Sequence, residues 1–301
     1  MFSRFDIEKE IGKGINIYPF HEQNIKENSI NLTLSHNAWA MTDGIIVKDK
    51  NKSWIKTTRK EGEPEDSVIN IKRGEKSIIK LSGKDYVVFL PHQTTNIETS
   101  EVLAVSNYIG GTLHSKVGLV CKGLGHIGTM LGPNYCGHLL VAIHNITDYS
   151  IILPVGETFV SIAFYRLDRI SGNHNSNISG HIDKLSELKI HLDESTRNYL
   201  LEDWKTSIES VREKLCDSKE YKDFKKRLIK RKIKSIMNYI NLKNIIVSIC
   251  MCLIIIGLYF FAAYLDKIEN TSIWSDRYWT IFITGILIPI FSLIINIFKR
   301  N

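Results

Sequence analysis

The side chains best suited to chemistry gather between residues 110 and 145, the stretch of the chain that is richest in glycine. It contains four of the ten histidines, at positions 114, 126, 138 and 144. Thr112, Ser115 and Lys116 add two hydroxyl groups and an ammonium group, which can bind phosphate oxygens. The glycines between Lys122 and Gly128 leave backbone N–H groups that could hold an anion. The stretch therefore predicts an anion-binding site on loops, with plain hairpin turns as the alternative.

The spacing of these histidines does not match a metal site. Gaps of 12, 12 and 6 residues give neither a helical pair of ligands nor a zinc knuckle. The five cysteines are scattered, and the only close pair, Cys250 and Cys252, lies inside an apolar run. A zinc deaminase would need HxE and PCxxC sequences, which are absent from this sequence. We therefore expect no metal, no cofactor and no disulfide framework.

Three segments resemble the dCTP deaminase/dUTPase family. Where family deaminases read RSSLARLGL, this chain reads GTLHSKVGL over residues 111–119. Where they read DPGWxGxxxLExxN, it reads GPNYCGHLLVAIHN over 132–145. Near the amino terminus, SINLTL at 29–34 is similar to the family's SxDLRL. The three segments occur in the family's order, and the resemblance covers about residues 4–168.

The resemblance implies a trimeric β fold that handles pyrimidine deoxynucleoside triphosphates in sites shared between subunits. On this basis we expect the nucleotide to be bound by side chains of the two central motifs and the loop between them: Thr112, Ser115, Lys116, His126, Asn134, Tyr135 and His138. The family's catalytic chemistry is not kept. Its catalytic Glu corresponds to Ala142, the Asp before the Pro to Gly132, and the first phosphate-holding Arg to Gly111. The resemblance thus implies binding without the usual catalysis, and it assigns no catalytic residue.

Two other functions remain open. The chain could be a working deaminase or dUTPase in which His126, His138 or His144 replaces the missing carboxylate, because a histidine has a suitable pKa for a general base. Alternatively, the β domain could serve only to form trimers, as part of a membrane scaffold. Fold alone does not decide between these functions.

The pattern of short strands predicts an all-β domain, a dUTPase-like barrel or sandwich, over residues 1–170. Between 35 and 105, apolar runs alternate with turn residues at intervals of about 8–12 residues, which is typical of sandwiches and barrels. Before them, Asp6 is expected to cap a short helix, and Ile15 and Ile17 to begin the first strand. The runs at 139–143, 151–153 and 158–167 are expected to be the last strands.

The composition changes after residue 170. Residues 171–195 are predicted to be a linker, and residues 196–243 an amphipathic helical segment. Its apolar stripe could pack on the β domain or form a coiled stalk between subunits; the stripe consists of Leu200, Trp204, Ile208, Val211 and Leu215. Residues 219–243 carry ten Lys/Arg and two Asp/Glu. This segment thus accounts for +8 of a net charge of +7 and leaves −1 for the rest, so we do not expect nucleic acid as a partner.

Residues 244–301 are predicted to form a two-helix transmembrane hairpin. The runs 245–265 and 278–298 each contain 21 residues without a charge, which is long enough to cross a bilayer core of about 30 Å. The short loop 266–277 carries two basic and three acidic residues, whereas the flanking segments are basic. The positive-inside rule then places the β domain and both termini in the cytoplasm. The lipid bilayer is the partner of this hairpin, with the basic helix beside anionic lipid.

Overall fold

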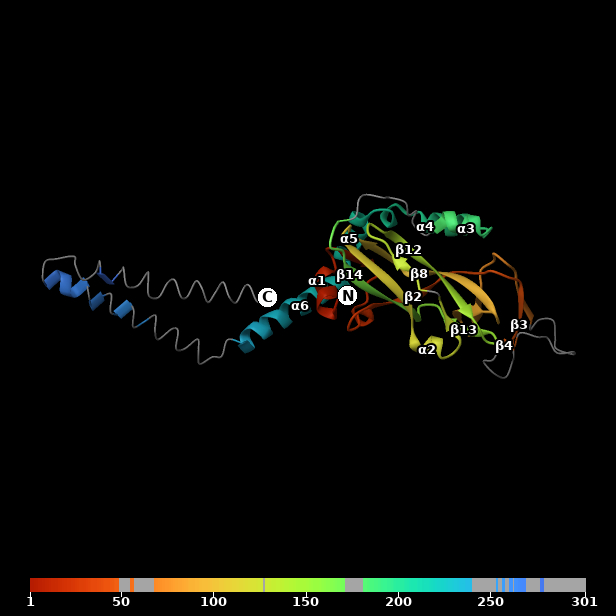
Figure 1. The fold of residues 1–301 in the computed structure, drawn as a ribbon, viewed down its shortest axis with the longest axis horizontal. Helices are drawn as coiled ribbons and strands as arrows, with labels where there is room; N and C mark the ends of the chain where they lie inside the picture. Colours follow the sequence, from red (N-terminus) through yellow and green to blue (C-terminus); the bar gives the residue numbers. More distant parts are fainter. Residues whose placement is uncertain are drawn as a thin grey trace. The chain divides into compact units, whose positions relative to one another are not determined.

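The computed structural model describes residues 1–48, 55–56, 68–126, 128–170 and 181–239, and some positions between 253 and 278 (253, 256–257, 260–261, 263–268 and 277–278). The chain divides into two compact units, Met1–Lys226 and Arg227–Asn301. The first unit is a β domain that carries several helices (Figure 1).

The strands of the first unit follow one another closely along the chain. The first half contains β1 (Ile15–Tyr18), β2 (Ile30–Ala40), β3 (Gly44–Lys48), β4 (Ile55–Lys56), β5 (Val68–Ile71), β6 (Ile78–Leu81), β7 (Lys84–Phe89) and β8 (Gln93–Val105). The second half contains β9 (Ile109–Ser115), β10 (Leu124–Gly125), β11 (Met130–Leu131), β12 (Cys136–Asn145), β13 (Ile151–Pro154) and β14 (Thr158–Arg166). The β-branched and aromatic residues of these runs explain why they are strands.

The described strands form one large sheet and two small ones. The large sheet has eight strands in the order β10-β12-β8-β2-β14-β9-β11, with β1 also paired to β8. The small sheets have the orders β13-β7-β6 and β4-β3-β5. The named strands pair antiparallel. This arrangement confirms the predicted all-β character of the domain, and Leu32, Leu34 and Ile97 on its central strands are fully buried.

The first helix, α1 (Arg4–Glu10), begins earlier than predicted. Its N-cap is Ser3, whose hydroxyl accepts a hydrogen bond from the Asp6 backbone N–H, while the Asp6 carboxylate accepts one from the Ser3 N–H at 2.9 Å. The predicted cap, Asp6, is therefore the third helical residue of a capping box. The sequence pattern located the helix correctly, but assigned the capping role to the wrong one of two suitable residues.

Two irregularities in the large sheet shape its surface. The register between β2 and β8 shifts between Leu34 and Ala38, and the register between β12 and β8 shifts between His138 and Leu140. At a bulge of this kind, successive side chains no longer alternate regularly between the two faces of the sheet. The first bulge brings the polar residues 35–37 together on β2, and the second lies beside a fully buried histidine, His138.

The predicted helical segment is not one continuous helix: shorter helices precede the 21-residue helix α6. It consists of α3 (Ile182–Glu187), α4 (Glu194–Leu200), η4 (Asp203–Lys205), α5 (Ile208–Asp217) and α6 (Lys219–Tyr239). Ser207 caps α5 by accepting a hydrogen bond from the Ser210 N–H, so the predicted single stripe is interrupted after Leu200. The α3 helix and the first two residues of α4 lie within the range predicted to be a linker. Residues 171–180 of that range lie outside the described residues.

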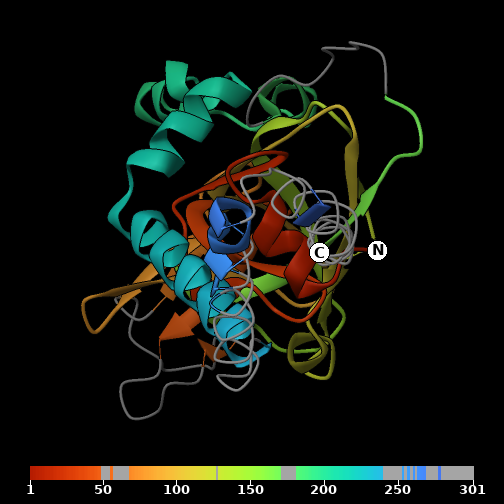
Figure 2. The same cartoon turned by 90° about the vertical axis from the view of Figure 1, so that its left-hand side faces the viewer.

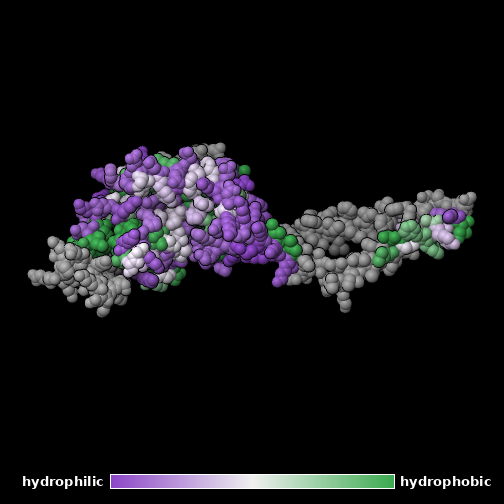
Figure 3. Space-filling view, turned by 180° about the vertical axis from the view of Figure 1, so that it is seen from behind, coloured by the Kyte–Doolittle hydropathy of each residue, from purple (hydrophilic) through white to green (hydrophobic). Residues whose placement is uncertain are grey.

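These helices pack on the β domain. Leu185, Ile190 and Leu200 form a buried cluster with Trp39 of β2, and Val211 of α5 packs against Val102 and Ala104 of β8. Figures 1 and 2 show α3 and α4 along one side of the sheets, with the short helix α2 (Val117–Val120) on the other. Of the two predicted arrangements, the packed helix is confirmed for α5. On the face that Figure 3 shows, hydrophilic residues dominate and apolar residues form small patches.

The predicted membrane spans, 245–265 and 278–298, lie mostly outside the described residues. Within the part of the chain that the structure describes, we find no helix that is both long enough and apolar enough to cross a bilayer.

Candidate functional site

The end of β9 brings Ser115 and His126 into contact. Ser115 is the last residue of β9 and His126 directly follows β10. The Ser115 hydroxyl oxygen lies 2.6 Å from His126 Nδ1 and accepts a hydrogen bond from the His126 backbone N–H at 2.9 Å. Because this oxygen already accepts from the backbone, its own hydrogen can be donated to Nδ1. The imidazole then acts as the acceptor of the pair.

The surroundings of His126 favour this neutral form. Burial lowers the pKa of His126 below 6.5, because desolvation disfavours the charged imidazolium. Its Nε2 atom is buried and has no hydrogen-bond partner among the described residues. At neutral pH the ring can therefore accept a proton from the Ser115 hydroxyl, which is the arrangement that activates a hydroxyl or a water molecule.

Lys116 lies next to this pair. It precedes the first residue of α2, and its ammonium group donates a hydrogen bond to the Thr158 hydroxyl on β14. Strands β9 and β14 are neighbours, with Ser115 opposite Val160, so the sheet itself brings Lys116 and Thr158 together. The end of β9 thus carries two separate hydrogen-bonded pairs, Ser115 with His126 and Lys116 with Thr158.

Thr112 does not join this group. Its hydroxyl lies 2.9 Å from Nε2 of His114, an exposed residue on the same strand. Residues two apart in a strand share a face, whereas residues three apart lie on opposite faces. Thr112 and His114 therefore face away from the side of β9 that carries Ser115.

Part of the predicted anion cradle in the glycine-rich turn after α2 is already occupied by hydrogen bonds within the chain. The N–H groups of Lys122 and Gly123 donate to the carbonyls of Leu119 and Val120 at 2.9 Å, and the His126 N–H donates to Ser115. These donors are already used within the chain. Gly123 is required for the turn itself, because its φ is +89° and a Cβ atom there would lie 2.3 Å from Thr147.

The remaining predicted residues form a second, buried group. The Tyr135 hydroxyl donates to the His138 carbonyl and lies 3.4 Å from Nε2 of His181. Tyr135 is only 3% exposed, so the structure uses it for packing between β12 and the start of α3 rather than as an open surface for a base. Asn134 adopts a left-handed conformation, with a φ of +60°. Its N–H donates to the Ser106 carbonyl at 3.4 Å.

His138 is fully buried, and it is the most strongly perturbed histidine that the structure describes. Its Nδ1 lies 2.8 Å from the Thr99 carbonyl, while its Nε2 has no partner among the described residues. Burial, reinforced by the charge of Lys205, lowers the pKa of His138 to about 4. The residue is therefore neutral at physiological pH and enclosed.

Sequence reasoning missed two buried carboxyl groups on β8. Glu98 and Glu101 are 0% and 1% exposed, and burial raises their pKa values to about 8 and about 7. Glu101 accepts two hydrogen bonds from Thr33, at 2.9 Å from the N–H and 2.8 Å from the hydroxyl. The only signal in the sequence is the presence of two acidic residues in an otherwise strand-like run. Perturbed carboxyl groups of this kind are often found near functional sites.

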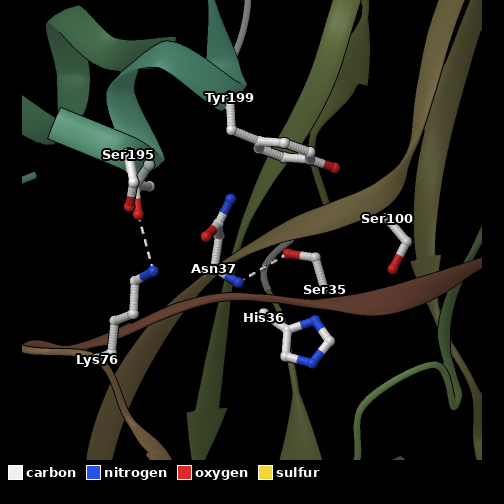
Figure 4. A pocket seen from close by; sticks show the side chains of 8 residues that line it. Ser35, His36, Asn37, Lys76, Ser100, Ser195 and Tyr199 are labelled. Atoms are coloured by element: carbon white, nitrogen blue, oxygen red, sulfur yellow. Dashed lines mark hydrogen bonds between the residues drawn. The ribbon is translucent and has the colours of Figure 1, made fainter. Parts of the chain in front are cut away.

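Glu98 lies on the same face of the sheet as Ala142. On the paired strands β8 and β12, Glu98 is opposite Leu140 and Asn96 is opposite Ala142, and residues two apart share a face. The Asn37 amide donates to Glu98 at 3.3 Å. Asn37 in turn lines a cavity of about 290 Å³ between β2, β8 and α4 (Figure 4). The side chains around this cavity all carry polar groups: Ser35, His36, Asn37, Lys76, Ser100, Ser195, Thr196 and Tyr199.

Among the described residues, no group of three or more His, Cys, Asp or Glu side chains is arranged to hold a metal ion.

Comparisons with known proteins place the first part of the chain in a family. A family model described as dCTP deaminase-like matches residues 1–167. No curated protein matches the sequence. Among solved structures, the chain is similar to a 2'-deoxycytidine 5'-triphosphate deaminase from Agrobacterium tumefaciens, with 12% identity and a TM-score of 0.37. This match covers 63% of the present chain and 54% of the deaminase, so the chain spans about half of that protein's length.

Two dUTPase structures are also similar. The match to native EIAV dUTPase has 15% identity and a TM-score of 0.26, and it covers 47% of this chain and 100% of that one. The match to the dUTPase from phage phi11 of S. aureus has 12% identity and a TM-score of 0.26, and it covers 46% of this chain and 99% of that one. The family model spans more than half of the chain, over the same residues that form the β domain. On this ground, the protein belongs to the dCTP deaminase-like family.

Proposed function

We propose that this protein is a membrane-anchored deoxynucleotide-binding protein that uses the family's fold without its usual catalysis. The proposal rests on one observation: the chain keeps polar side chains that can bind a nucleotide, but lacks the carboxylate that the family uses for catalysis. Lys116 contacts Thr158 just beyond the end of β9, whereas the position of the family's catalytic Glu is Ala142. A methyl group cannot take a proton from water, and general acid–base catalysis contributes roughly 100- to 10,000-fold to rate.

The chemistry at the end of β9 suits a phosphate group. The Lys116 ammonium now donates to a neutral hydroxyl, and a phosphate oxygen is a stronger acceptor because the hydrogen bond is assisted by charge. The Thr158 hydroxyl, which accepts from Lys116, keeps its own hydrogen and can also donate to a phosphate oxygen. Family membership makes a pyrimidine deoxynucleoside triphosphate the ligand to test first.

Titration of the full chain in detergent micelles with dCTP, dUTP and dTTP tests this function. Lys116→Ala should weaken binding by about 1.5–3 kcal/mol, the range for a hydrogen bond to a charged group. Lys122→Ala removes an exposed lysine from the same loop and should leave affinity unchanged. If no triphosphate binds, or if both variants weaken binding equally, the proposed site is wrong.

A second candidate function rests on the contact between Ser115 and His126. A neutral imidazole 2.6 Å from a hydroxyl has the geometry of a general base, and His126 could replace the lost carboxylate. In that case the protein would release ammonia from dCTP, or pyrophosphate from dUTP, and His126→Gln would abolish this activity while leaving binding intact. Turnover at the background rate in the wild-type chain would exclude this candidate.

A trimer is the assembly that the family suggests, and exposed apolar side chains support it. Val117, Val120, Ile146 and Tyr149 are 78%, 51%, 73% and 54% exposed. They lie on α2 and on the loop after β12. The turn that follows α2 is joined to this loop by a hydrogen bond from the Ile146 N–H to the Gly123 carbonyl at 3.0 Å. Burying these side chains between subunits would place a neighbouring chain close to Lys116.

The carboxyl-terminal part of the chain, from residue 219 onward, supports attachment to a membrane. Helix α6 is strongly basic, and Ile229 and Ile233 on it are 56% and 51% exposed. A helix with these features is suited to an anionic membrane surface, at about 1 kcal/mol for each Lys or Arg near it. Together with the two apolar runs that follow, this helix supports a topology with the β domain and both termini on the cytoplasmic side of a bilayer.

A further inference from the structure

Helix α5 and the short helix η4 before it border an open groove that none of the sites described above uses. Its volume is about 550 Å³, within the range for small-molecule sites, which is roughly 300–1,000 Å³. Two aromatic rings line it, those of Tyr18 at the end of β1 and Trp204 in η4. The rings meet at 88°, with their centroids 5.4 Å apart, and both side chains are only half-buried. Each ring therefore keeps surface that a ligand can reach.

The outer face of α5 forms a wall of the groove. Val211 on the opposite face is fully buried against β8, whereas Glu213, Lys214 and Asp217 are exposed and line the groove. Glu213 and Asp217 are four residues apart, so their side chains lie on one face of the helix, with about 5–6 Å between Cβ atoms. Asp203 adds a third carboxylate from η4. The lining thus carries three carboxylates and one ammonium group, which favours a cationic ligand.

Two of these carboxylates are available to a ligand. Asp217 lies 3.6 Å from the Lys222 ammonium group. Asp203 and Glu213 form no ion pair with any residue that the structure describes. The serine hydroxyls on the lining are already paired within the chain. Recognition in this groove must therefore come from the carboxylates and the faces of the rings.

The Trp204 ring already attracts cations. The ammonium group of Lys205 lies 5.3 Å from the ring centroid, and that of Lys214 lies 5.6 Å from it. Lys205 is fully buried and donates to the Tyr199 carbonyl at 2.5 Å, so it is fixed in place. Lys214 is exposed and can move aside. Because a cation is attracted to the face of an aromatic ring, Lys214 marks a position that the ammonium group of a ligand can take.

We propose that this groove binds a linear aliphatic polyamine. One ammonium group would take the place of Lys214 at the Trp204 ring, and a second would pair with Glu213. The methylene chain between them would lie on the aromatic rings, as the stems of lysine side chains do on apolar surfaces. The seven-residue step from Ser210 to Asp217 gives the wall a length of about 10 Å, which accommodates more than one ammonium group. The groove shares no residue with the site proposed at Lys116.

Titration of spermidine into the full chain in uncharged detergent micelles tests this inference. We expect saturable binding by calorimetry at low ionic strength. Glu213→Gln and Trp204→Leu should each weaken it about threefold to fivefold, the effect of losing one exposed ion pair or one exposed cation–π contact. Glu209→Gln removes the same charge from α5 outside the lining of the groove and should leave the affinity unchanged. Trp204→Phe keeps an aromatic ring and should retain most of the affinity.

The position assigned to Lys214 has its own readout. Lys214→Ala should strengthen spermidine binding about twofold or more, because the variant lacks the ammonium group that competes for the ring. Lys214 and Glu213 are both exposed, so these two variants keep the test valid if a Trp204 variant does not fold.

Three outcomes would overturn the polyamine site. They are no saturable binding at millimolar spermidine, equal loss of affinity in Glu209→Gln and Glu213→Gln, or displacement of spermidine by an equal concentration of Mg²⁺, which would indicate an ordinary acidic surface. A failure of triphosphate binding would leave this inference intact, because the two ligands depend on different variants.

Discussion

Glu101 shows how a single buried side chain can make stability depend on pH. Burial raises its pKa from 4.5 to about 7, although two hydrogen bonds from Thr33 act in the opposite direction. The folded chain therefore holds a proton that the unfolded chain releases in this range. The stability contributed by this proton is fully present below about pH 4.5 and is lost as the pH rises through about 7.

We predict that Glu101→Gln reduces the loss of stability between about pH 4.5 and pH 8, because glutamine has no proton to release. The wild-type free energy of unfolding should fall by more than about 1 kcal/mol over this range, since one pKa unit corresponds to about 1.4 kcal/mol. Chemical denaturation at both pH values, followed by tryptophan fluorescence, measures the two slopes. Glu98 also contributes to the wild-type slope, so the difference between the two proteins isolates Glu101. Identical slopes would show that Glu101 is ionised in the folded state.

At the scale of elements, α5 joins the helical segment to the sheet. Val211 is fully buried against Val102 and Ala104, with Trp204 and Ile208 alongside. If α5 served only as a stalk between subunits, a substitution at Val211 would not change the free energy of unfolding of the β domain. Because of this contact, α5 contributes to the stability of the β domain.

We predict that Val211→Ala lowers the free energy of unfolding by about 2 kcal/mol, from two lost buried carbon groups and the cavity that remains. Glu213→Ala changes an exposed residue of the same helix and should have an effect below about 0.5 kcal/mol. Both variants can be compared by denaturation under identical conditions. A neutral Val211→Ala would mean that α5 does not stay on β8 in solution.

At the scale of the whole molecule, the proposed trimer would be held together by the exposed apolar residues near Lys116. We predict that Val117→Asp converts a trimer into monomers, because a charge buried without a partner in a subunit interface is costly. Ile170→Asp introduces the same charge at another exposed apolar residue, 69% exposed, and should leave the mass unchanged. Light scattering on micelle-solubilised protein measures both. A trimer that tolerates Val117→Asp must use another surface.

The topology of the chain gives a second prediction at this scale. In a chain whose native cysteines are replaced by serine, Ser272→Cys should react with an impermeant thiol reagent added to intact cells. The reason is that the loop 266–277 has fewer basic than acidic residues, unlike the segments on either side. Asn301→Cys at the carboxyl terminus is the matched control and should react only after permeabilisation. The reverse pattern would place the β domain outside the cytoplasm.

The sequence alone determined the fold class and the family. Local signals were sufficient here: alternating apolar residues set the strands, and three motifs in the family's order identified the β domain. The assignment of the family's catalytic Glu position to Ala142 is likewise an interpretation of the motif alone. The break in the apolar stripe after Leu200 could not be seen in the sequence. The helical periodicity continues across a capping residue such as Ser207, and tertiary contacts decide where each helix ends.

Only the tertiary structure decided which of the predicted site residues lie together. It joins Ser115 with His126, separates Thr112 by the alternation of β9, and encloses Tyr135 and His138 beneath the segment that begins at His181. It also shows Glu98 beside the cavity under α4, although Glu98 and Tyr199 are 101 positions apart in the sequence. The physical reason is that burial and pairing depend on strand register and on long-range packing, and neither leaves a local trace in the sequence.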